Sequence, residues 1–461
     1  MKKIILLSFF VFASLCVMAN TISGDWYGNL NVMGQQLPLV FHIGSEEAGY
    51  KTTLDSPKQG VKGIPVGLVI VTSDSILDLK MDALRASFHG VLKSNDKIEG
   101  TFTQGMSFPM NLSREKQEVV KIKRPQDPAK PYPYKSEGVT FSHDGITLAG
   151  TLTLPSEGCN FPAVVLVSGS GQQNRDEELM NHRPFLVLSD YLTRNGIAVL
   201  RYDDRGIGGS NGLSAENTFI DFAKDAACAI KYLKGRKDVN PSKVGILGHS
   251  EGGLIGFIEG ANPVSAPAFV VSLAGPAVKG ADLMVKQNEL TAKTEGVTMG
   301  AKEHENLVRI FKALATKNNS DSLRKELTAL MIDTYKILGK NVGDEEMGEI
   351  NQSINAMLQS GYHAFVAYDP TAVIRRIKCP VMAINGGMDS QVDAEQNLGA
   401  IEAIKRSTGH KNLTTKLYPN VNHLFQTVNH LCSVVEYGNI EETMSPEVLS
   451  DIAKWILSVT K

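Results

Sequence analysis

Hydrophobic and polar residues alternate with a period of two in the first quarter of the chain. The clearest run places four apolar residues on one side of an extended segment: Leu37, Leu39, Phe41 and Ile43. This period is typical of a half-buried β-strand. Similar runs, separated by turn-forming Gly, Asn and Asp residues, occur at residues 67–71, 87–92 and 97–102. The pattern predicts a small all-β domain, a barrel or a sandwich, over residues 20–114.

The pattern changes after about residue 135. Short and nearly continuous apolar runs occur at residues 163–168, 198–202, 244–247, 269–273 and 381–385. Such runs are typical of strands that are buried on both faces of a sheet. Amphipathic helical patterns separate them, for example at residues 219–234. Strands that alternate with helices predict an α/β domain with a mostly parallel sheet over residues 135–461.

A long stretch with helical periodicity separates the last two of these apolar runs. One of its helices is indicated by four residues at spacings of three and four: Leu307, Ile310, Phe311 and Leu314. We predict a helical insertion over about residues 278–368. Loops at the carboxyl ends of strands line the active sites of α/β proteins, so the insertion would act as a lid. A packing subdomain that touches no site is the alternative.

Prolines crowd the segment between the two patterns, at Pro125, Pro128, Pro131 and Pro133. Proline-rich segments form semi-rigid spacers. We therefore predict a linker over residues 115–134, with a domain boundary inside it.

The first residues have the pattern of an export signal. Lys2 and Lys3 precede an apolar run over residues 4–19, which is short for a membrane span. Small residues at Val17 and Ala19 suit cleavage after Ala19. We predict a signal peptide over residues 1–19 and export to the periplasm or the medium, with no stable membrane insertion afterwards. A membrane anchor is the alternative.

Composition and charge exclude several classes. The 461 residues carry 47 Lys and Arg against 49 Asp and Glu, and this net charge of −2 argues against a nucleic-acid partner. Beyond the predicted signal, the cysteines are widely separated and form no CxxC pair: Cys159, Cys228, Cys379 and Cys432. We therefore expect no metal site and no cofactor. Disulfide pairing and oligomeric state are left open.

A Gly-x-Ser-x-Gly motif carries the most specific chemistry. Gly248, Ser250 and Gly252 lie between an apolar strand pattern at residues 244–247 and an apolar helix pattern at residues 254–258. A serine on a sharp strand-to-helix turn exposes its hydroxyl above the sheet, and the flanking glycines remove β-carbons that would clash. This context predicts that Ser250 is a catalytic nucleophile.

A nucleophilic serine needs a general base and an acid that orients it. Asp389 follows the strand pattern at residues 381–385, and His423 lies in a loop after a strand pattern at residues 414–418. The order Ser, Asp, His along the chain is that of α/β-hydrolases. We predict Ser250, Asp389 and His423 as the catalytic triad. The competing positions are Asp393 and Glu395 for the acid and His430 for the base.

Acyl transfer also needs two backbone N–H groups that stabilise the developing oxyanion. Glu251, directly after the nucleophile, would supply one of them. The other would come from the glycine-containing loop at residues 169–176, with Gly171 or Gln172 as the donor.

These motifs together resemble those of the α/β-hydrolase superfamily, and more narrowly of bacterial esterases and serine aminopeptidase-like hydrolases. The resemblance rests on four segments: 169–171 (Gly-Ser-Gly), 174–176 (Asn-Arg-Asp), 201–210 (Arg-Tyr-Asp-Asp-Arg-Gly-Ile-Gly-Gly-Ser) and 248–253 (Gly-His-Ser-Glu-Gly-Gly). It implies an α/β-hydrolase fold with a helical lid, preceded here by the small all-β domain. Gln172 and Asn174 replace the proline and aspartate usual in relatives, which affects the loop that shapes the acyl pocket.

Three functions compete. The first is hydrolysis of carboxylic esters through an acyl-enzyme, with a small-molecule ester as substrate. The second is a serine aminopeptidase or dipeptidase acting on a short peptide, in which Glu177 or Glu178 would hold the substrate amine. The alternative for these acids is that Asp176, Glu177 and Glu178 cap the next helix, where the helix dipole favours negative charge. The third is a ligand-binding module with a vestigial hydrolase.

Overall fold

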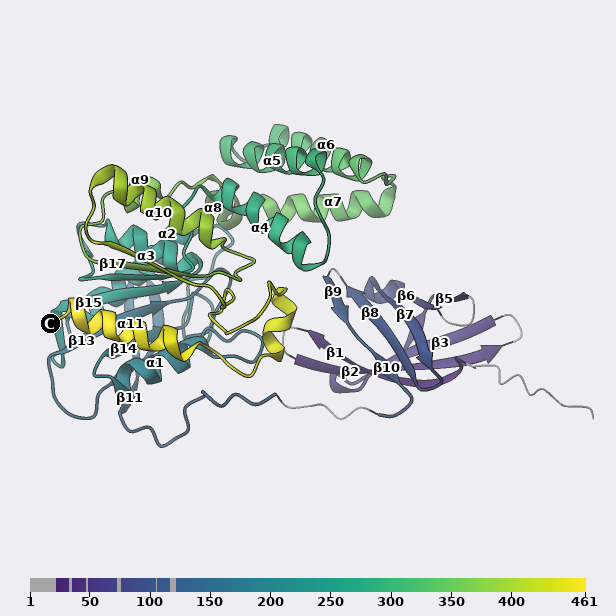
Figure 1. The fold of residues 1–461 in the computed structure, drawn as a ribbon, viewed down its shortest axis with the longest axis horizontal. Helices are drawn as coiled ribbons and strands as arrows, with labels where there is room; N and C mark the ends of the chain where they lie inside the picture. The colour runs from purple at the N-terminus through teal and green to yellow at the C-terminus, as the bar shows by residue number, and fades with distance from the viewer. Residues whose placement is uncertain (1–21, 33–34, 47–48, 73–75, 105, 117–121) are drawn as a thin grey trace, which may run out of the picture. The chain divides into compact units, whose positions relative to one another are not determined.

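Figure 1 shows the computed structural model, which describes the chain from residue 22 onward except for residues 33–34, 47–48, 73–75, 105 and 117–121. The predicted signal peptide at residues 1–19 lies outside the described residues. The chain divides into two units, Met1–Lys121 and Ile122–Lys461, each with its own sheet. The predicted order of an all-β unit followed by an α/β unit is confirmed.

The described part of the first unit forms a nearly closed, barrel-like antiparallel sheet. Its order is β4-β3-β2-β1-β10-β8-β7-β6-β5, and β9 pairs with β8 (Figure 1). The strands are β1 (Gly24–Val32), β2 (Gln35–Glu46), β3 (Gly49–Ser56), β4 (Val61–Val66), β5 (Leu68–Thr72), β6 (Ile76–Met81), β7 (Ala86–Ser94), β8 (Lys97–Gln104), β9 (Met106–Pro109) and β10 (Leu112–Ser113). Two single 3₁₀ turns, Pro57–Gln59 and Asp82–Leu84, interrupt them.

The alternation in β2 determines which side chains enter the core of this unit. Leu39, Phe41 and Ile43 are buried, whereas His42 between them bonds the exposed Asp25. Trp26 is fully buried, and its indole N–H donates to a backbone oxygen 2.7 Å away. A large aromatic ring with a satisfied polar group is a stable core residue.

The second unit contains an eight-stranded sheet with the order β11-β12-β14-β13-β15-β16-β17-β18. β12 pairs antiparallel with both of its neighbours, and the other pairs are parallel. The strands are β11 (Lys135–His143), β12 (Ile146–Leu154), β13 (Phe161–Val167), β14 (Ala198–Tyr202), β15 (Val239–His249), β16 (Val270–Leu273), β17 (Val381–Gly386) and β18 (Leu413–Tyr418). In a parallel sheet of this kind, ligands bind beyond the carboxyl ends of the strands.

Helices cover both faces of this sheet because successive residues of its strands point to opposite faces. In β13, Ala163, Val165 and Val167 join one core, and Val164 and Leu166 join the other. The helices of the first core are α2 (Phe219–Lys234), α3 (Glu251–Gly260), α9 (Thr371–Ile374) and α10 (Ala394–Thr408). Those of the second are α1 (Pro184–Arg194) and α11 (Pro446–Val459).

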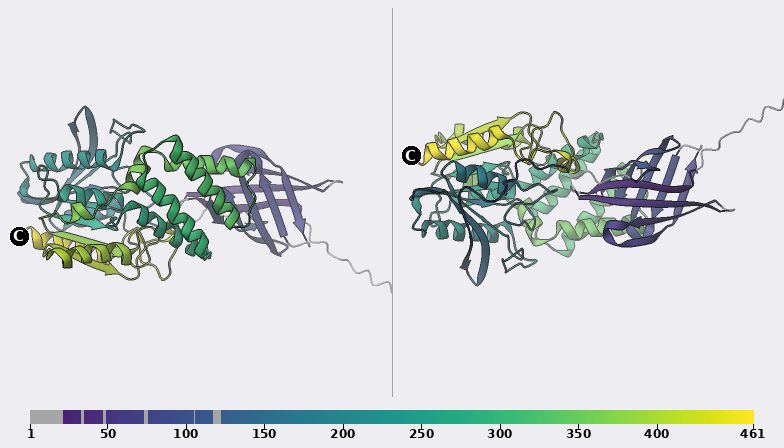
Figure 2. Two further views of the ribbon diagram at one scale, coloured as in Figure 1. Left: turned by 90° about the horizontal axis from the view of Figure 1, so that it is seen from above. Right: turned by 90° about the horizontal axis from the view of Figure 1, so that it is seen from below.

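Between β16 and β17 the chain forms a group of helices with a core of its own. They are α4 (Gly280–Thr294), α5 (Ala301–Thr316), α6 (Asp321–Ile337), α7 (Asp344–Met357) and α8 (Ser360–Ala367). Leu314, Leu323, Leu327 and Ile350 are fully buried in this core. In Figure 2 these helices, drawn in green, gather at one end of the second unit. We call this group the helical insertion.

Residues 122–134, part of the predicted linker, belong to the second unit. The Arg124 guanidinium donates to the backbone oxygens of Gly438 and Ile440, each at 2.8 Å. Asp127 pairs with Arg183 at 2.5 Å, and the Tyr134 hydroxyl donates to Asp190. These bonds fix the start of the second unit against α1 and the segment before α11.

Candidate active site

Ser250 lies at the junction of β15 and α3, at the carboxyl edge of the sheet. Its backbone has φ 55° and ψ −119°, a conformation that a non-glycine residue rarely adopts. A β-carbon on Gly248 would overlap the backbone of Gly252, and one on Gly252 would overlap the carbonyl of Val167. Both motif glycines are therefore required, because the two ends of the β15–α3 turn lie against each other and the turn also lies against β13.

We expect Gly248→Ala to destabilise the protein by about 3 kcal/mol or more, because backbone atoms would have to move to admit the new methyl group. Thermal and urea unfolding measure this effect. Gly399→Ala is the matched control, because Gly399 is an exposed residue of α10 whose added β-carbon would meet no atom within 4 Å. There alanine should stabilise the helix by about 0.5–1 kcal/mol. Equal unfolding midpoints for the two variants would contradict the steric explanation.

Asp389 and His423 form a buried pair after β17 and β18. His423 Nδ1 lies 2.8 Å from Asp389 Oδ2, and the two residues are 4% and 3% exposed, respectively. The other oxygen of Asp389, Oδ1, accepts the backbone N–H groups of Gln391 and Val392, each at 2.8 Å. The carboxylate is thus fixed at one oxygen by the backbone and presents the other to the imidazole.

The loop that carries His423 is held by its own polar side chains. Asn422 Oδ1 accepts the backbone N–H groups of Leu424 and Gln426 at 3.1 and 3.0 Å. Asn422 Nδ2 donates to Gln426 Oε1, and both side chains are fully buried. This Asx-type turn was not predicted from the sequence, although the Asn directly before the histidine is a turn-forming residue that could have indicated it.

The β15–α3 turn and the His423 loop meet directly. His249, the residue before Ser250, places its Nε2 2.9 Å from the backbone oxygen of His423. Among the described residues, no hydrogen bond joins the His423 side chain to Ser250 Oγ. Catalytic hydrogen bonds are often longer before substrate binds. The structure therefore brings Asp389 and His423 into direct contact. It places Ser250 beside this pair, because the preceding residue, His249, bonds the His423 backbone oxygen.

The loop after β13 lies against the nucleophile. A β-carbon on Gly169 would lie 3.3 Å from Ser250 Cβ, and the Gly169 N–H donates to Glu177 Oε1 at 2.8 Å. That N–H is therefore engaged, and a second oxyanion donor has to come from further along the loop. Gly171, with φ 94°, and Gln172 are exposed there, so they remain the predicted donors.

Glu177 has a role that sequence reasoning missed. Its carboxylate is 1% exposed and bonds His249 Nδ1 at 2.9 Å, and its backbone has φ 51°. The helix that follows, α1, has Arg183 as its N-cap and no acidic residue in its first turn, so the interpretation of Asp176, Glu177 and Glu178 as helix caps is wrong. Strained backbone at a buried charged residue is typical of functional sites.

Burial raises the pKa values of two further carboxyl groups, one directly after Ser250 and the other shortly after β14. Burial raises the pKa of Glu251, directly after Ser250, to about 7. Burial also raises the pKa of Asp204 to about 7, although the Gln173 N–H and the Ser168 hydroxyl favour its charged form. Perturbed pKa values of this kind concentrate at functional sites.

The competing positions have other partners. Asp393 is the N-cap of α10 and accepts the Gln396 N–H at 2.8 Å, and Glu395 is exposed on that helix. His430 is exposed and bonds Glu436 at 3.0 Å. None of the three is bonded to Ser250 or His423 among the described residues.

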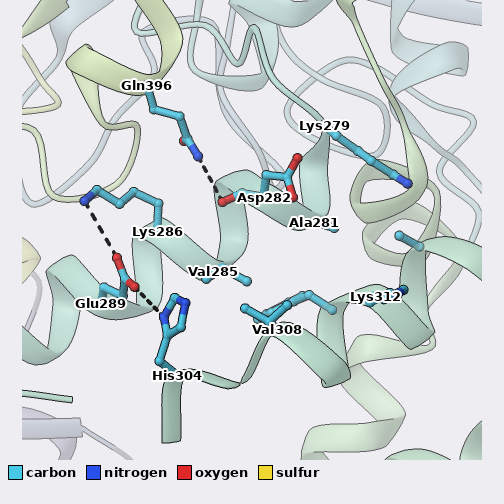
Figure 3. A pocket seen from close by; sticks show the side chains of 12 residues that line it. Lys279, Ala281, Asp282, Val285, Lys286, Glu289, His304, Val308, Lys312 and Gln396 are labelled. Carbon is cyan, nitrogen blue, oxygen red and sulfur yellow. Dashed lines mark hydrogen bonds and ion pairs between the residues drawn. The ribbon is translucent and has the colours of Figure 1, made fainter. Parts of the chain in front are cut away.

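A separate cavity of about 360 Å³ lies in the helical insertion, between α4 and α5 (Figure 3). Lys286, Glu289 and His304 form a chain of ion pairs along one side, and Gln396 bonds the Asp282 backbone oxygen on another. None of the predicted catalytic residues lines this cavity, so it is distinct from the site around Ser250.

The described residues also show whether they meet the requirements of metal sites, membrane-spanning helices and disulfide bonds. In the part that the structure describes, no group of three or more His, Cys, Asp or Glu residues is arranged to hold a metal ion. No helix among the described residues is both long and apolar enough to cross a membrane. The four cysteines named above are all outside disulfides.

Known proteins resemble this chain over part of its length. The family described as serine aminopeptidase, S33, matches residues 183–427. Esterase EstD of Thermotoga maritima is 27% identical over 314 residues, which are 67% of this chain and 65% of that protein. An uncharacterized Mycobacterium tuberculosis protein is 30% identical over 118 residues, 25% of this chain and 38% of its own length. The chain thus covers less than two thirds of the length of these curated relatives.

Among solved structures, Est1E from Butyrivibrio proteoclasticus aligns with 70% of this chain and 98% of its own. The alignment has 16% sequence identity and a TM-score of 0.40. The family match extends over more than half of the chain and includes Ser250, Asp389 and His423. The chain therefore belongs to the serine aminopeptidase S33 family of α/β-hydrolases.

Proposed function

We propose that this protein is a serine hydrolase that cleaves carboxylic esters through an acyl-enzyme intermediate. The observation that carries the proposal is the buried His423–Asp389 pair, which lies against the β15–α3 turn that exposes Ser250. A nucleophile, a base and a group that orients the base are the parts that acyl transfer needs.

The chemistry has two halves. Ser250 Oγ attacks the ester carbonyl carbon while His423 Nε2 takes the hydroxyl proton, and the carbonyl oxygen becomes an oxyanion. The C–O bond to the alcohol then breaks, and His423 returns the proton to the departing alcohol. In the second half, water attacks the acyl carbon and loses a proton to His423. The bond from that carbon to Ser250 Oγ then breaks, and His423 returns the proton to Oγ, which releases the carboxylic acid and restores the serine hydroxyl. Asp389 keeps the imidazole oriented and offsets its positive charge in both halves.

The oxyanion would be stabilised by the backbone N–H of Glu251 and by one donor from Gly171 or Gln172. The Glu251 N–H is at the first position of α3, where the partial positive charge of the helix adds to the hydrogen bond. Removing a single donor of this kind from other hydrolases costs about 10²–10³ in kcat.

Ester cleavage is favoured over aminopeptidase activity by the position of Glu177. An aminopeptidase needs a carboxylate that is free to bind the substrate amine, whereas Glu177 is buried and already bonded to His249 and Gly169. Glu178, the other acid predicted for this role, is exposed and accepts a hydrogen bond from the Asn174 side chain at 3.2 Å. The name of the relative Esterase EstD also agrees with ester cleavage. The family description, serine aminopeptidase, makes the peptide substrate the alternative to test.

Labelling by a fluorophosphonate probe tests the proposal first. Wild-type protein should become covalently labelled at Ser250, and mass spectrometry of the tryptic peptide should locate the adduct. A panel of p-nitrophenyl esters and aminoacyl-anilides then separates the two activities, and we expect kcat/KM to be higher for the esters. Failure to label Ser250 would remove both enzyme functions and favour the binding-module hypothesis.

A further inference from the structure

A second histidine lies beside the proposed base. His249 is 5% exposed, and the centre of its ring lies 4.7 Å from that of His423. Its Nε2 faces the His423 backbone oxygen at 2.9 Å, and its Nδ1 faces Glu177 Oε1 at 2.9 Å. The reaction described above gives no role to His249 or Glu177, although both are buried next to Gly169 and Ser250.

The donors and acceptors around His249 determine where its protons lie. A backbone oxygen can only accept, so His249 Nε2 has to carry a hydrogen. Glu177 Oε1 accepts the Gly169 N–H at 2.8 Å, so this oxygen also acts as an acceptor. The 2.9 Å contact between Nδ1 and Oε1 is then best satisfied by a second N–H on the ring. This arrangement favours hydrogens on both ring nitrogens of His249, with Glu177 Oε1 and the His423 backbone oxygen as their acceptors.

The charges around the ring agree with this assignment. Burial by itself lowers the pKa of His249, but the charge and hydrogen bond of Glu177 raise it, and the His423 oxygen and the Asp389 charge add to this, so the pKa is raised overall. A buried charge is tolerated when it is paired and hydrogen-bonded, as both members of this pair are. Asp204, whose own pKa is affected by the charges of Glu177 and Glu251, belongs to the same group of carboxyls.

We propose that His249 is a positioning residue for the general base and that Glu177 anchors it. The pair ties together three segments: the β15–α3 turn through His249 itself, the His423 loop through its backbone oxygen, and the loop after β13 through the Gly169 N–H. The inference rests on the proposed function, because it takes His423 as the base for Ser250.

The physical basis is restraint of His423 at two points. Asp389 holds the side chain at Nδ1, and His249 holds the same residue at its backbone oxygen. Together they limit how far the imidazole can move away from Ser250. A displacement of about 1 Å in a reacting group costs about 10²-fold in rate.

Two amide substitutions separate the two bonds of His249. The amide nitrogen of His249→Gln can reach the position of Nε2 and keep the donor to the His423 oxygen. The shorter side chain of His249→Asn reaches only the position of Nδ1, so it keeps the bond to Glu177 and loses the one to His423. We expect kcat to fall about 100-fold in His249→Asn and less than about 10-fold in His249→Gln, with KM within about twofold in both.

The pH profile provides a readout that loss of stability would not change. When His249 loses its ring proton at high pH, the Nδ1 lone pair faces the Glu177 carboxylate, and their repulsion weakens the restraint. Glu177→Gln removes the charge that raises the pKa of His249, so the alkaline fall in kcat should move to lower pH. His143→Gln is the control, because His143 bonds Asp225 at 2.6 Å in another part of the unit. It should alter the thermal midpoint and leave the pH profile unchanged.

The outcomes are distinguishable. Equal losses of kcat in His249→Asn and His249→Gln, or losses that follow their thermal midpoints, would overturn the positioning role. An unchanged pH profile in Glu177→Gln would do the same. If Ser250→Ala keeps wild-type turnover, the proposed function itself fails and the inference with it. If Ser250→Ala is inactive while His249→Asn is fully active, only the inference fails.

Discussion

Replacing Ser250 with alanine should lower kcat for a p-nitrophenyl ester by about 10⁴- to 10⁶-fold, to the residual rate that substrate binding and the oxyanion donors provide. The reason is the loss of the only atom that forms the acyl bond in the proposed reaction. Single-turnover and steady-state kinetics on purified protein measure the effect, and fluorophosphonate labelling should be abolished in the same sample. The unfolding midpoint should stay close to that of the wild type, since one oxygen atom at a half-buried position is removed.

His423→Ala should reduce kcat by a similar factor, because a nucleophile and its base act as a unit and their losses are not additive. The matched control is His430→Ala. His430 lies seven positions further along the chain but is exposed and bonded to Glu436. The His430→Ala variant should have a kcat within about twofold of the wild-type value. A loss in His430→Ala comparable to that in His423→Ala would show that the base has been assigned to the wrong histidine.

Asp389→Asn should lower kcat by about 10⁴-fold, the size of effect seen for the equivalent change in other serine hydrolases. Asp389 Oδ1 accepts two backbone N–H groups, so the oxygen of an asparagine would stay at that position. Its NH₂ group would then face His423 Nδ1, where Oδ2 lies 2.8 Å away in the wild type. The imidazole would adopt the tautomer with its hydrogen on Nε2, which cannot accept the proton of Ser250.

Asp393→Asn is the control for this change. Asp393 caps α10 by accepting the Gln396 N–H at 2.8 Å, and asparagine is an equally good N-cap. Activity and stability should both remain close to wild type. Kinetics over a range of pH should show that the Asp389→Asn defect persists at alkaline pH, because it results from the tautomer. Recovery of wild-type kcat at any pH would contradict this explanation.

Much of the second unit follows from local sequence. The helical pattern at residues 219–234 coincides with α2, and the apolar run at 198–202 coincides with β14. The turn that exposes Ser250 was predicted from its two glycines and from the strand and helix beside them. These signals were readable because periodicity and close approach act within a few residues. The catalytic assignments of Ser250, Asp389 and His423 stay predictions until the variants above are measured.

The sequence identifies the second oxyanion donor less clearly than it identifies the turn at Ser250. The loop at residues 169–176 contains several backbone N–H groups, and any residue type can supply one. The structure shows that the Gly169 N–H is taken by Glu177, which narrows the choice to later positions. No side-chain pattern in the sequence could have indicated this, because the bond joins a backbone group to a carboxylate eight residues away.

The sequence by itself determined the α/β class, the small all-β domain before it, the insertion of helices and the sharp turn at Ser250. Only the tertiary structure decided which buried polar groups became partners. Glu177 and His249 are 72 positions apart, and His249 and His423 are 174 apart. Their bonds depend on which loops meet at the carboxyl edge of the sheet. A buried carboxylate or imidazole has to find a partner, but its identity is set by the packing of the whole unit.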